Sequence, residues 1–171
     1  IMELNKYFII AVLSILCFTS CKTESETEAT VTEITEAVTE QKQTTKQLLE
    51  DLKAKGFQTF SYYDETLKDT VVMQQYFIAF LKRGKNRSQG EKEAAEIQEQ
   101  HQAHLGKMYE LGYADISGPM GDDGDIRGIT IYNVPTKDIA DSLANSDPMV
   151  KAGRLSVIVK PWWAAKGFGL R

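Results

Sequence analysis

The chain has 171 residues, of which 42% are hydrophobic and 26% charged, and its net charge at pH 7 is −4. This length suits one small domain with extensions, and the modest acidic balance does not suggest nucleic-acid binding. We expect no nucleic-acid partner and no cofactor.

Residues 1–20 have the pattern of a bacterial signal peptide. Lys6 supplies a positive charge before the apolar run at 7–18, which is too short for the roughly 20 residues of a membrane span but fits the core of a secretory signal. The run ends in "FTSC", which resembles the lipobox of bacterial lipoproteins and implies lipidation of Cys21. An ordinary secretory signal, or an uncleaved anchor, with a chance cysteine is the alternative. We expect a protein of the bacterial cell envelope, anchored to a membrane through lipid on Cys21 and facing the periplasm or the surface.

The segment after the signal predicts little structure of its own. Loss of Cys17 with the signal and lipidation of Cys21 would leave no free thiol, which excludes a disulfide framework, a cysteine zinc site and cysteine catalysis. Residues 21–45 are rich in Thr and Glu and contain no aromatic residue, so they cannot bury enough surface to fold and indicate an acidic tether. Residues 46–70 predict a short helix ending before Gly56, followed by an aromatic arm, "FQTFSYY".

The pattern over residues 71–163 predicts one folded domain of the α+β class. A strand at 71–84 is followed by a helix at 88–112, with a capping box at its start and Gly112 as its left-handed cap. The next segments predict a strand "YADISGP", a Gly-rich hairpin loop "MGDDGDIRG", a strand "ITIYNV", a helix "PTKDIADSLANS", a turn "DPMVKAG" and a last strand "RLSVIVKPWW". This β-α-β-β-α-β order is ferredoxin-like, with helices on one face of an antiparallel sheet. Residues 164–171 form a C-terminal tail.

The first predicted strand is apolar on both of its faces. Tyr76, Ile78 and Phe80 point one way, and Phe77, Ala79 and Leu81 point the other. Helices on one face would leave the other set exposed, and an exposed apolar patch of this kind marks an interface. We therefore expect a homodimer formed through the free face of the sheet; cover by the aromatic arm is the alternative.

Four segments resemble the YCII-related domain: "YFIAFLKRG", "GYADISGP", "RGITIYNV" and "DPMVKAGRLSVIVKPWW". The resemblance covers residues 73–163, and its most specific parts are Gly118–Pro119 and the turn that begins at Asp147. It implies a ferredoxin-like subunit that pairs through its sheet into a dimeric α/β barrel. It also implies an active site with a histidine on the first helix and an aspartate on the following strand. One branch resembles dehydrochlorinases of hydroxylated aromatics, in which this pair serves as acid–base. The signal and tether lie outside the family pattern.

The two histidines of the chain, His101 and His104, both lie on the apolar stripe of the predicted helix at about 100° per residue. The rises of helix and strand leave an axial offset of about 6 Å between His101 and Asp115, small enough for the two side chains to meet. The family's histidine and aspartate fall on the same two residues, with His104 as the competing histidine. A carboxylate on one imidazole nitrogen fixes the tautomer and raises the basicity of the other nitrogen, which suits a general acid or base.

Three interpretations of these residues remain open from the sequence. In the first, the protein is a lipid-anchored enzyme in which His101 is the acid–base and Asp115 orients it, with His104 and Asp147 as alternates. In the second, the pair is a buried structural contact in a non-catalytic ligand-binding or interaction module of the envelope. In the third, His101, His104 and Asp115 bind a metal, but three such ligands are few, and we predict no metal site.

Several other motifs suggest a place for a ligand. Gly118, Pro119 and Asp147 belong to the family motifs and are expected near the pocket, although Asp147 before a proline is also the pattern of a helix N-cap. The "GDDGD" loop at 121–125 lacks the length and the final glutamate of a calcium loop and indicates a solvated hairpin. The "KRGKNR" run at 82–87 is typical of a solvated loop; its place beside a helix N-terminus also suits attraction of an anionic ligand, as the alternative. The sequence does not identify the small molecule.

Overall fold

The computed structural model describes residues 43–170. The expected signal peptide, the lipidation site at Cys21 and nearly all of the expected tether lie outside the described residues. Within residues 43–170, no helix is both long enough and apolar enough to cross a membrane.

The described chain folds into helices and strands in the order that the sequence predicts for residues 71–163, with a helix and a strand added in front. The elements are α1 (Thr45–Ala54), β1 (Thr59–Asp64), β2 (Asp69–Arg83), α2 (Glu91–Glu110), β3 (Ala114–Pro119), β4 (Ile126–Tyr132), α3 (Lys137–Asn145), the one-turn α4 (Pro148–Lys151) and β5 (Leu155–Ala165). The predicted β-α-β-β-α-β arrangement is confirmed by β2, α2, β3, β4, α3 and β5.

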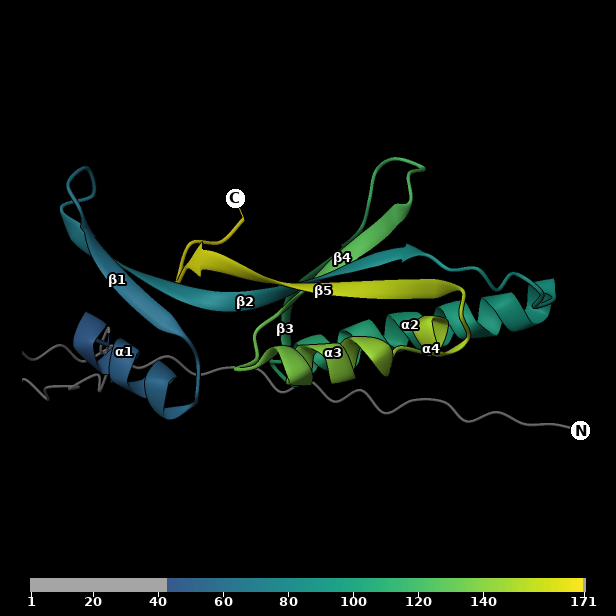
Figure 1. Ribbon diagram of the computed structural model, residues 1–171, viewed down its shortest axis with the longest axis horizontal. Helices are drawn as coiled ribbons and strands as arrows, with labels where there is room; N and C mark the ends of the chain where they lie inside the picture. The colour runs from purple at the N-terminus through teal and green to yellow at the C-terminus, as the bar shows by residue number, and fades with distance from the viewer. Residues whose placement is uncertain (1–42, 171) are drawn as a thin grey trace, which may run out of the picture. The chain divides into compact units, whose positions relative to one another are not determined.

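The long strand β2 organises the antiparallel sheet (Figure 1). Along one edge it pairs with β5, from Met73↔Ala165 to Arg83↔Leu155. Along the other edge its first half pairs with β1 and its second half with β4, and β3 lies outside β4. The ferredoxin-like part of the sheet therefore has the order β5-β2-β4-β3, with all neighbouring strands antiparallel.

The helices α2, α3 and α4 lie on one side of the sheet (Figure 1). The side chains of β2 that alternate toward them, Phe77, Ala79 and Leu81, are at most 6% exposed, and Phe77 packs in one cluster with Tyr132 and Val159. Complete burial of a Phe or Leu side chain contributes about 1.5–3 kcal/mol. The side chains of β2 that face the helices are thus buried, as the apolar pattern predicts.

The opposite side of the sheet carries no helix in the described part of the chain. The other alternation of β2 lies here. Tyr76 is buried, contrary to the expectation that this set is exposed, whereas Ile78 and Phe80 are half-buried and Ile158 and Trp162 of β5 are 44% and 41% exposed. The aromatic arm forms β1, which extends the sheet beside the first half of β2, and Phe60 of β1 packs against Trp163 with ring centroids 5.0 Å apart. β1 therefore does not cover Ile78 or Phe80.

The two ends of α2 differ in how well the sequence predicts them. Gly112 has φ 71°, and the Gly112 and Tyr113 amides donate back to the carbonyls of Tyr109 and Met108, which is the Schellman motif and confirms the predicted left-handed cap. The predicted capping box at the start is wrong, because Gly90 is the N-cap and has no side-chain bond.

Ser88, the predicted cap, is instead held in the loop before α2. Its hydroxyl donates to Asn86 Oδ1 at 2.7 Å. Asn86 is fixed in turn against the turn between α4 and β5, where its side chain donates to the Ala152 carbonyl at 3.0 Å and its backbone amide to the Gly153 carbonyl at 3.0 Å. A contact distant in sequence therefore overrides the local capping signal.

Candidate active site

The centre of the candidate site is a buried contact between α2 and the turn before α4. His101 lies in the middle of α2 and is 8% exposed, and its Nδ1 is 2.6 Å from Oδ2 of Asp147, which is 2% exposed. The other carboxylate oxygen, Oδ1, accepts from the backbone amide of Met149 at 2.8 Å. Both oxygens of Asp147 are therefore engaged, so the carboxylate holds the imidazole in one orientation.

Local sequence explains why Asp147 is placed there. Helix α3 ends at Asn145 with Ser146 as its C-cap, and Asp147 is the N-cap of α4 with Pro148 at the first helical position. This confirms the capping role that the Asp-Pro pattern predicts. Because α4 packs against α2, the cap that starts α4 also points its carboxylate at the buried histidine. The sequence predicts both His101 and Asp147 as candidate site residues but does not predict the contact between them.

The expected pairing of His101 with Asp115 is wrong. Asp115 is exposed, and its Oδ1 accepts from the side chain of Asn133 at 3.2 Å. Its neighbour Ala114 packs in the core on the helix side. A β-bulge at Asp115 leaves both Asp115 and the next residue, Ile116, on the other side of the sheet, where they line a groove with Tyr76. The rises of the helix and the strand predict only how far apart His101 and Asp115 lie along the element axes. They do not predict on which face of the sheet each side chain lies.

His104 does not replace His101 in the pair. It is half-buried, its Nε2 is buried with no partner among the described residues, and it does not line the cleft described below. Burial lowers the pKa of His104 below its ordinary value near 6.5. A metal site formed by His101, His104 and Asp115 is not possible, because Asp115 lies on the other side of the sheet. Residues 43–170 contain no group of three His, Cys, Asp or Glu side chains placed to bind a metal ion.

A cleft of about 430 Å³ opens beside His101, within the usual range of about 300–1,000 Å³ for small-molecule sites. It lies between α2, the ends of β3 and β4, and the α4–β5 segment. Its walls are formed by Leu81, Arg87, Gln98, His101, Gln102, Leu105, Ser117, Gly118, Pro119, Arg127, Gly128, Ile129, Met149 and Leu155. Of the predicted ligand-binding residues, Gly118 and Pro119 line the cleft, whereas Asp147 is not among the lining residues and contacts His101.

Because Asp147 engages Nδ1 of His101, Nε2 is the ring nitrogen available to a molecule in the cleft. Asp147 also influences Tyr132 in the core, where burial first and this carboxylate second raise the pKa of the phenol. Tyr132 therefore stays protonated near neutral pH.

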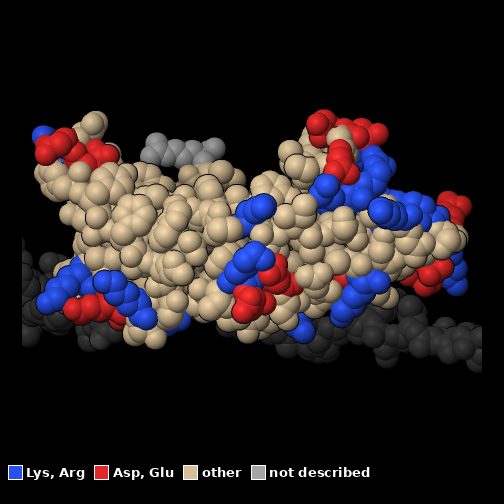
Figure 2. Space-filling model, in the orientation of Figure 1, with Lys and Arg blue, Asp and Glu red and all other residues tan. Residues whose placement is uncertain are grey.

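Two arginines of the cleft, Arg87 and Arg127, were not predicted as site residues. Arg127 follows the acidic "GDDGD" hairpin loop, and Arg87 ends the basic "KRGKNR" run. Figure 2 shows Lys and Arg side chains beside Asp and Glu side chains at the end of the molecule that carries the β3–β4 hairpin. The available signal for Arg87 is the basic run itself, because positive charge beside a helix N-terminus attracts an anion. Nothing in the hairpin pattern indicates that Arg127 lines a cleft.

Comparison with known proteins gives a family and one similar structure. A family model described as the YCII-related domain matches residues 76–163. One solved structure that matches part of this chain is that of 5-chloro-2-hydroxyhydroquinone dehydrochlorinase (TftG) from Burkholderia phenoliruptrix AC1100, in a complex with 2,5-dihydroxybenzoquinone. That similarity has 24% sequence identity and a TM-score of 0.36, and it covers 51% of this chain and 92% of the dehydrochlorinase chain. No curated protein matches the sequence.

Proposed function

The chain belongs to the YCII-related domain family over residues 76–163, and on this basis we propose that its cleft is a site of acid–base chemistry on a small molecule. His101 carries the proton and Asp147 is its positioning residue. The observation that carries the proposal is the 2.6 Å contact between Nδ1 of buried His101 and buried Asp147, placed beside a cleft that His101 itself lines.

The proposed mechanism follows from the two nitrogens of the imidazole. Neutral His101 donates its Nδ1 proton to Asp147, so Nε2 holds a lone pair toward the cleft. An acidic hydrogen of the bound molecule passes to Nε2 while its electron pair stays on the molecule, and the carboxylate of Asp147 stabilises the imidazolium that forms. The proton then returns from Nε2 to the molecule or to its leaving group. Removal of water from the cleft by apolar walls strengthens these interactions.

A structural role for the pair is the second candidate, and one observation favours it. Asp147 ties α2 to α4 and caps α4 at the same time, so the contact stabilises the fold whether or not a proton is transferred. In this case the protein is a non-catalytic module of the envelope that binds a ligand or partner. The two candidates differ in whether loss of His101 removes an activity or only stability.

We further propose that the protein is an envelope lipoprotein and a homodimer. The lipoprotein proposal rests on the sequence around Cys21, and replacement of Cys21 by serine tests it, with loss of metabolic labelling by a fatty acid as the expected result. The dimer proposal is supported by the free face of the sheet, where Phe80, Met120, Ile126 and Ile158 line a hollow of about 590 Å³. Charged side chains border this hollow: Lys82, Asp122, Asp125 and Lys160.

The catalytic proposal can be tested by proton exchange, which does not require knowledge of the natural reaction. The full chain is incubated in D₂O with 2,5-dihydroxybenzoquinone, a small and planar probe, and exchange of the ring C–H for deuterium is followed by NMR. This exchange requires addition of a deuteron to the ring carbon and then removal of the original proton from the same carbon, so it reports both proton transfers expected of His101. We expect the wild type to accelerate exchange and His101→Asn to lose the acceleration. His104→Asn is the matched control, since His104 lies one turn away on the same helix and does not line the cleft. Equal exchange with His101→Asn, or a large loss of stability with no activity to lose, would support the structural role.

A further inference from the structure

We infer that the cleft selects small molecules that carry a negatively charged group, and that Arg127, held by the side chain of Asp123, is the residue that binds this group. The inference names the substrate class of the site and so rests on the proposed function for the place of the chemistry. Its physical basis, the charges and contacts around Arg127, is independent of whether His101 transfers a proton.

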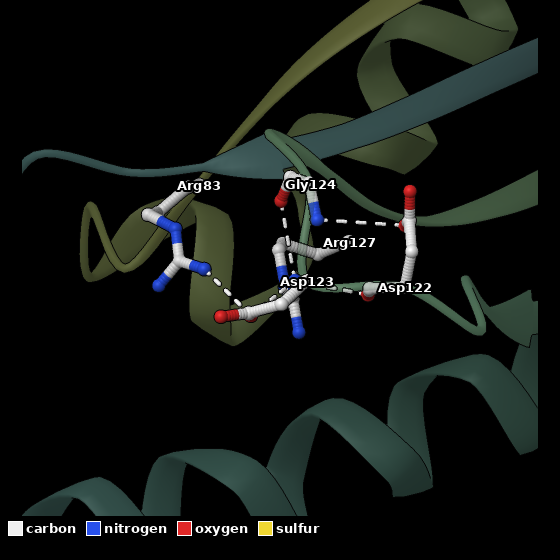
Figure 3. A network of polar contacts seen from close by, with 5 residues as sticks. All are labelled: Arg83, Asp122, Asp123, Gly124 and Arg127. Carbon is white, nitrogen blue, oxygen red and sulfur yellow. Dashed lines mark hydrogen bonds and ion pairs between the residues drawn. The ribbon is translucent and has the colours of Figure 1, made fainter.

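The β3–β4 hairpin holds one end of the Arg127 guanidinium (Figure 3). Nη1 donates to Oδ1 of Asp123 at 2.8 Å, to the carbonyl of Gly124 at 3.1 Å and to the carbonyl of Asp122 at 3.4 Å. All three of these bonds leave from the same nitrogen, and Nη2 and Nε donate to no residue that the structure describes. Because the side chain also lines the cleft of His101, its remaining donors are available to a bound molecule.

Asp123 accepts hydrogen bonds from two arginines. Its Oδ1 accepts from Nη2 of Arg83 at 2.9 Å as well as from Arg127 (Figure 3), and its own side chain is 88% exposed. The other carboxylates of the hairpin, Asp122 and Asp125, line the hollow on the opposite side of the sheet, where Asp125 pairs with Lys82, so they do not line the cleft. Exposed ion pairs contribute only about 0–1 kcal/mol to stability. The effect of this network is therefore mainly to orient Arg127, and the acidic hairpin loop is more than a solvated turn.

The remaining walls of the cleft define the kind of molecule that fits. Arg87 adds a second positive charge, and the lining includes no Asp or Glu. The carboxylate of Asp147 contacts His101 and Met149 and does not compensate the arginines. Apolar side chains, among them Leu105 and Leu155, offer a surface for a ring or a hydrocarbon body. The cleft therefore suits a small organic acid with an apolar body.

An anionic group at Arg127 would also serve the proposed chemistry. A guanidinium with two free donor positions binds a carboxylate or an acidic hydroxyl with strong, directional hydrogen bonds. It fixes the position of the molecule relative to His101, and it stabilises the negative charge that develops when Nε2 removes a proton.

Matched acids and amides test the charge of the ligand directly. The full chain is titrated by calorimetry with benzoate, 4-hydroxybenzoate and 2,5-dihydroxybenzoate, and with the corresponding neutral amides. We expect at least one acid to bind about tenfold or more tightly than its amide, as one charge-assisted contact predicts, and to weaken as salt is raised.

Variants of the arginine network assign the effect to Arg127. Arg127→Gln should remove the preference for the acid, Arg127→Lys should retain part of it, and Asp123→Asn should reduce it while the melting temperature stays close to that of the wild type. Lys92→Gln is the matched control, because it removes one positive charge from α2 at a side chain that is 93% exposed and outside the cleft. Equal binding of acid and amide, failure of every acid to bind, or an unchanged preference in Arg127→Gln would overturn the inference.

The same titrations separate this inference from the proposed function. If His101→Asn keeps the preference for the acid while the wild type shows no catalysed exchange, the anion site stands and the catalytic proposal fails. If exchange depends on His101 but amides bind as tightly as acids, the catalytic proposal stands and the anion site fails.

Discussion

The replacement of Asp147 by asparagine separates the positioning of His101 from the stability of the fold. An asparagine keeps an oxygen for the backbone amide of Met149, so the cap of α4 survives. Its amide group, however, donates to Nδ1 of His101, where the carboxylate accepted at 2.6 Å. The proton of the neutral imidazole then moves to Nε2, and the nitrogen that faces the cleft can no longer accept a proton.

The size of the effect follows from these contacts. Asparagine is as good an N-cap as aspartate, and exchange of one charge-assisted bond for a neutral one costs about 1 kcal/mol. A forced wrong tautomer at a histidine base lowers the rate by about 10²–10⁴-fold, judging from general-base contributions and from triads of the Ser-His-Asp type. Asp147→Ala, in contrast, loses the cap at about 0.5–2 kcal/mol and leaves a buried His101 donor unpaired at about 1–3 kcal/mol.

The assay combines deuterium exchange of 2,5-dihydroxybenzoquinone with thermal unfolding of the full chain. We expect Asp147→Asn to lose nearly all catalysed exchange with a small decrease in melting temperature, and Asp147→Ala to lose both. A folded Asp147→Asn variant with wild-type exchange would refute the positioning role. Equal destabilisation of the two variants would show that the charge of Asp147, and not only its cap of α4, stabilises the fold.

Three further predictions follow from other parts of the structure. Burial lowers the pKa of His104, so at a pH below its pKa in the unfolded chain, near 6.5, the unfolded chain binds more protons than the folded chain. The free energy of unfolding, measured by urea denaturation, should therefore fall as the pH drops from 7.5 to 5.5. The decrease should be smaller in His104→Leu. Gly128→Ala would place a Cβ 2.7 Å from the Gly118 carbonyl and should cost about 1–3 kcal/mol, whereas Gly118→Ala, with open space around its Cβ, should cost less than about 1 kcal/mol in the same measurement. Ile158→Lys should convert the proposed dimer to a monomer in light scattering; a wild-type chain that is already monomeric would contradict the dimer.

The sequence predicts most of the fold because each of the main elements has a local pattern that agrees with its tertiary setting. The two-faced β2 is buried by helices on one side, and Gly112 ends α2 in the left-handed region that only glycine adopts without strain. At the start of α2 the local pattern and the tertiary setting disagree. The hydroxyl of Ser88 donates to Asn86, which is itself bonded to a turn far along the chain, so Ser88 does not cap the helix. Contacts of that kind are absent from any local pattern.

The site is predicted as separate residues and not as an arrangement. The apolar stripe identifies His101 as buried, and the Asp-Pro pattern identifies Asp147 as a cap, but the two meet only through the packing of α2 against α4. Asp115 satisfies an estimate based on distance along the chain and lies on the wrong face of the sheet. Arg127 and Asp123 lie in a hairpin whose composition is that of an ordinary loop. That this loop holds the guanidinium of Arg127 beside the cleft is evident only from the three-dimensional structure.

The positions of the cleft and of the free face imply that binding and dimerisation are separable. The floor of the cleft is built from Leu81 and Leu155, which face the helices, whereas Ile158 belongs to the opposite alternation of β5. A charge introduced at Ile158 should therefore abolish the dimer and leave the preference of the cleft for acids within about twofold, which is well below the tenfold change that one lost charge-assisted contact produces. Loss of acid binding in a folded Ile158→Lys monomer would show instead that the partner subunit completes the site, and the cleft of a single chain would then be only part of the binding surface.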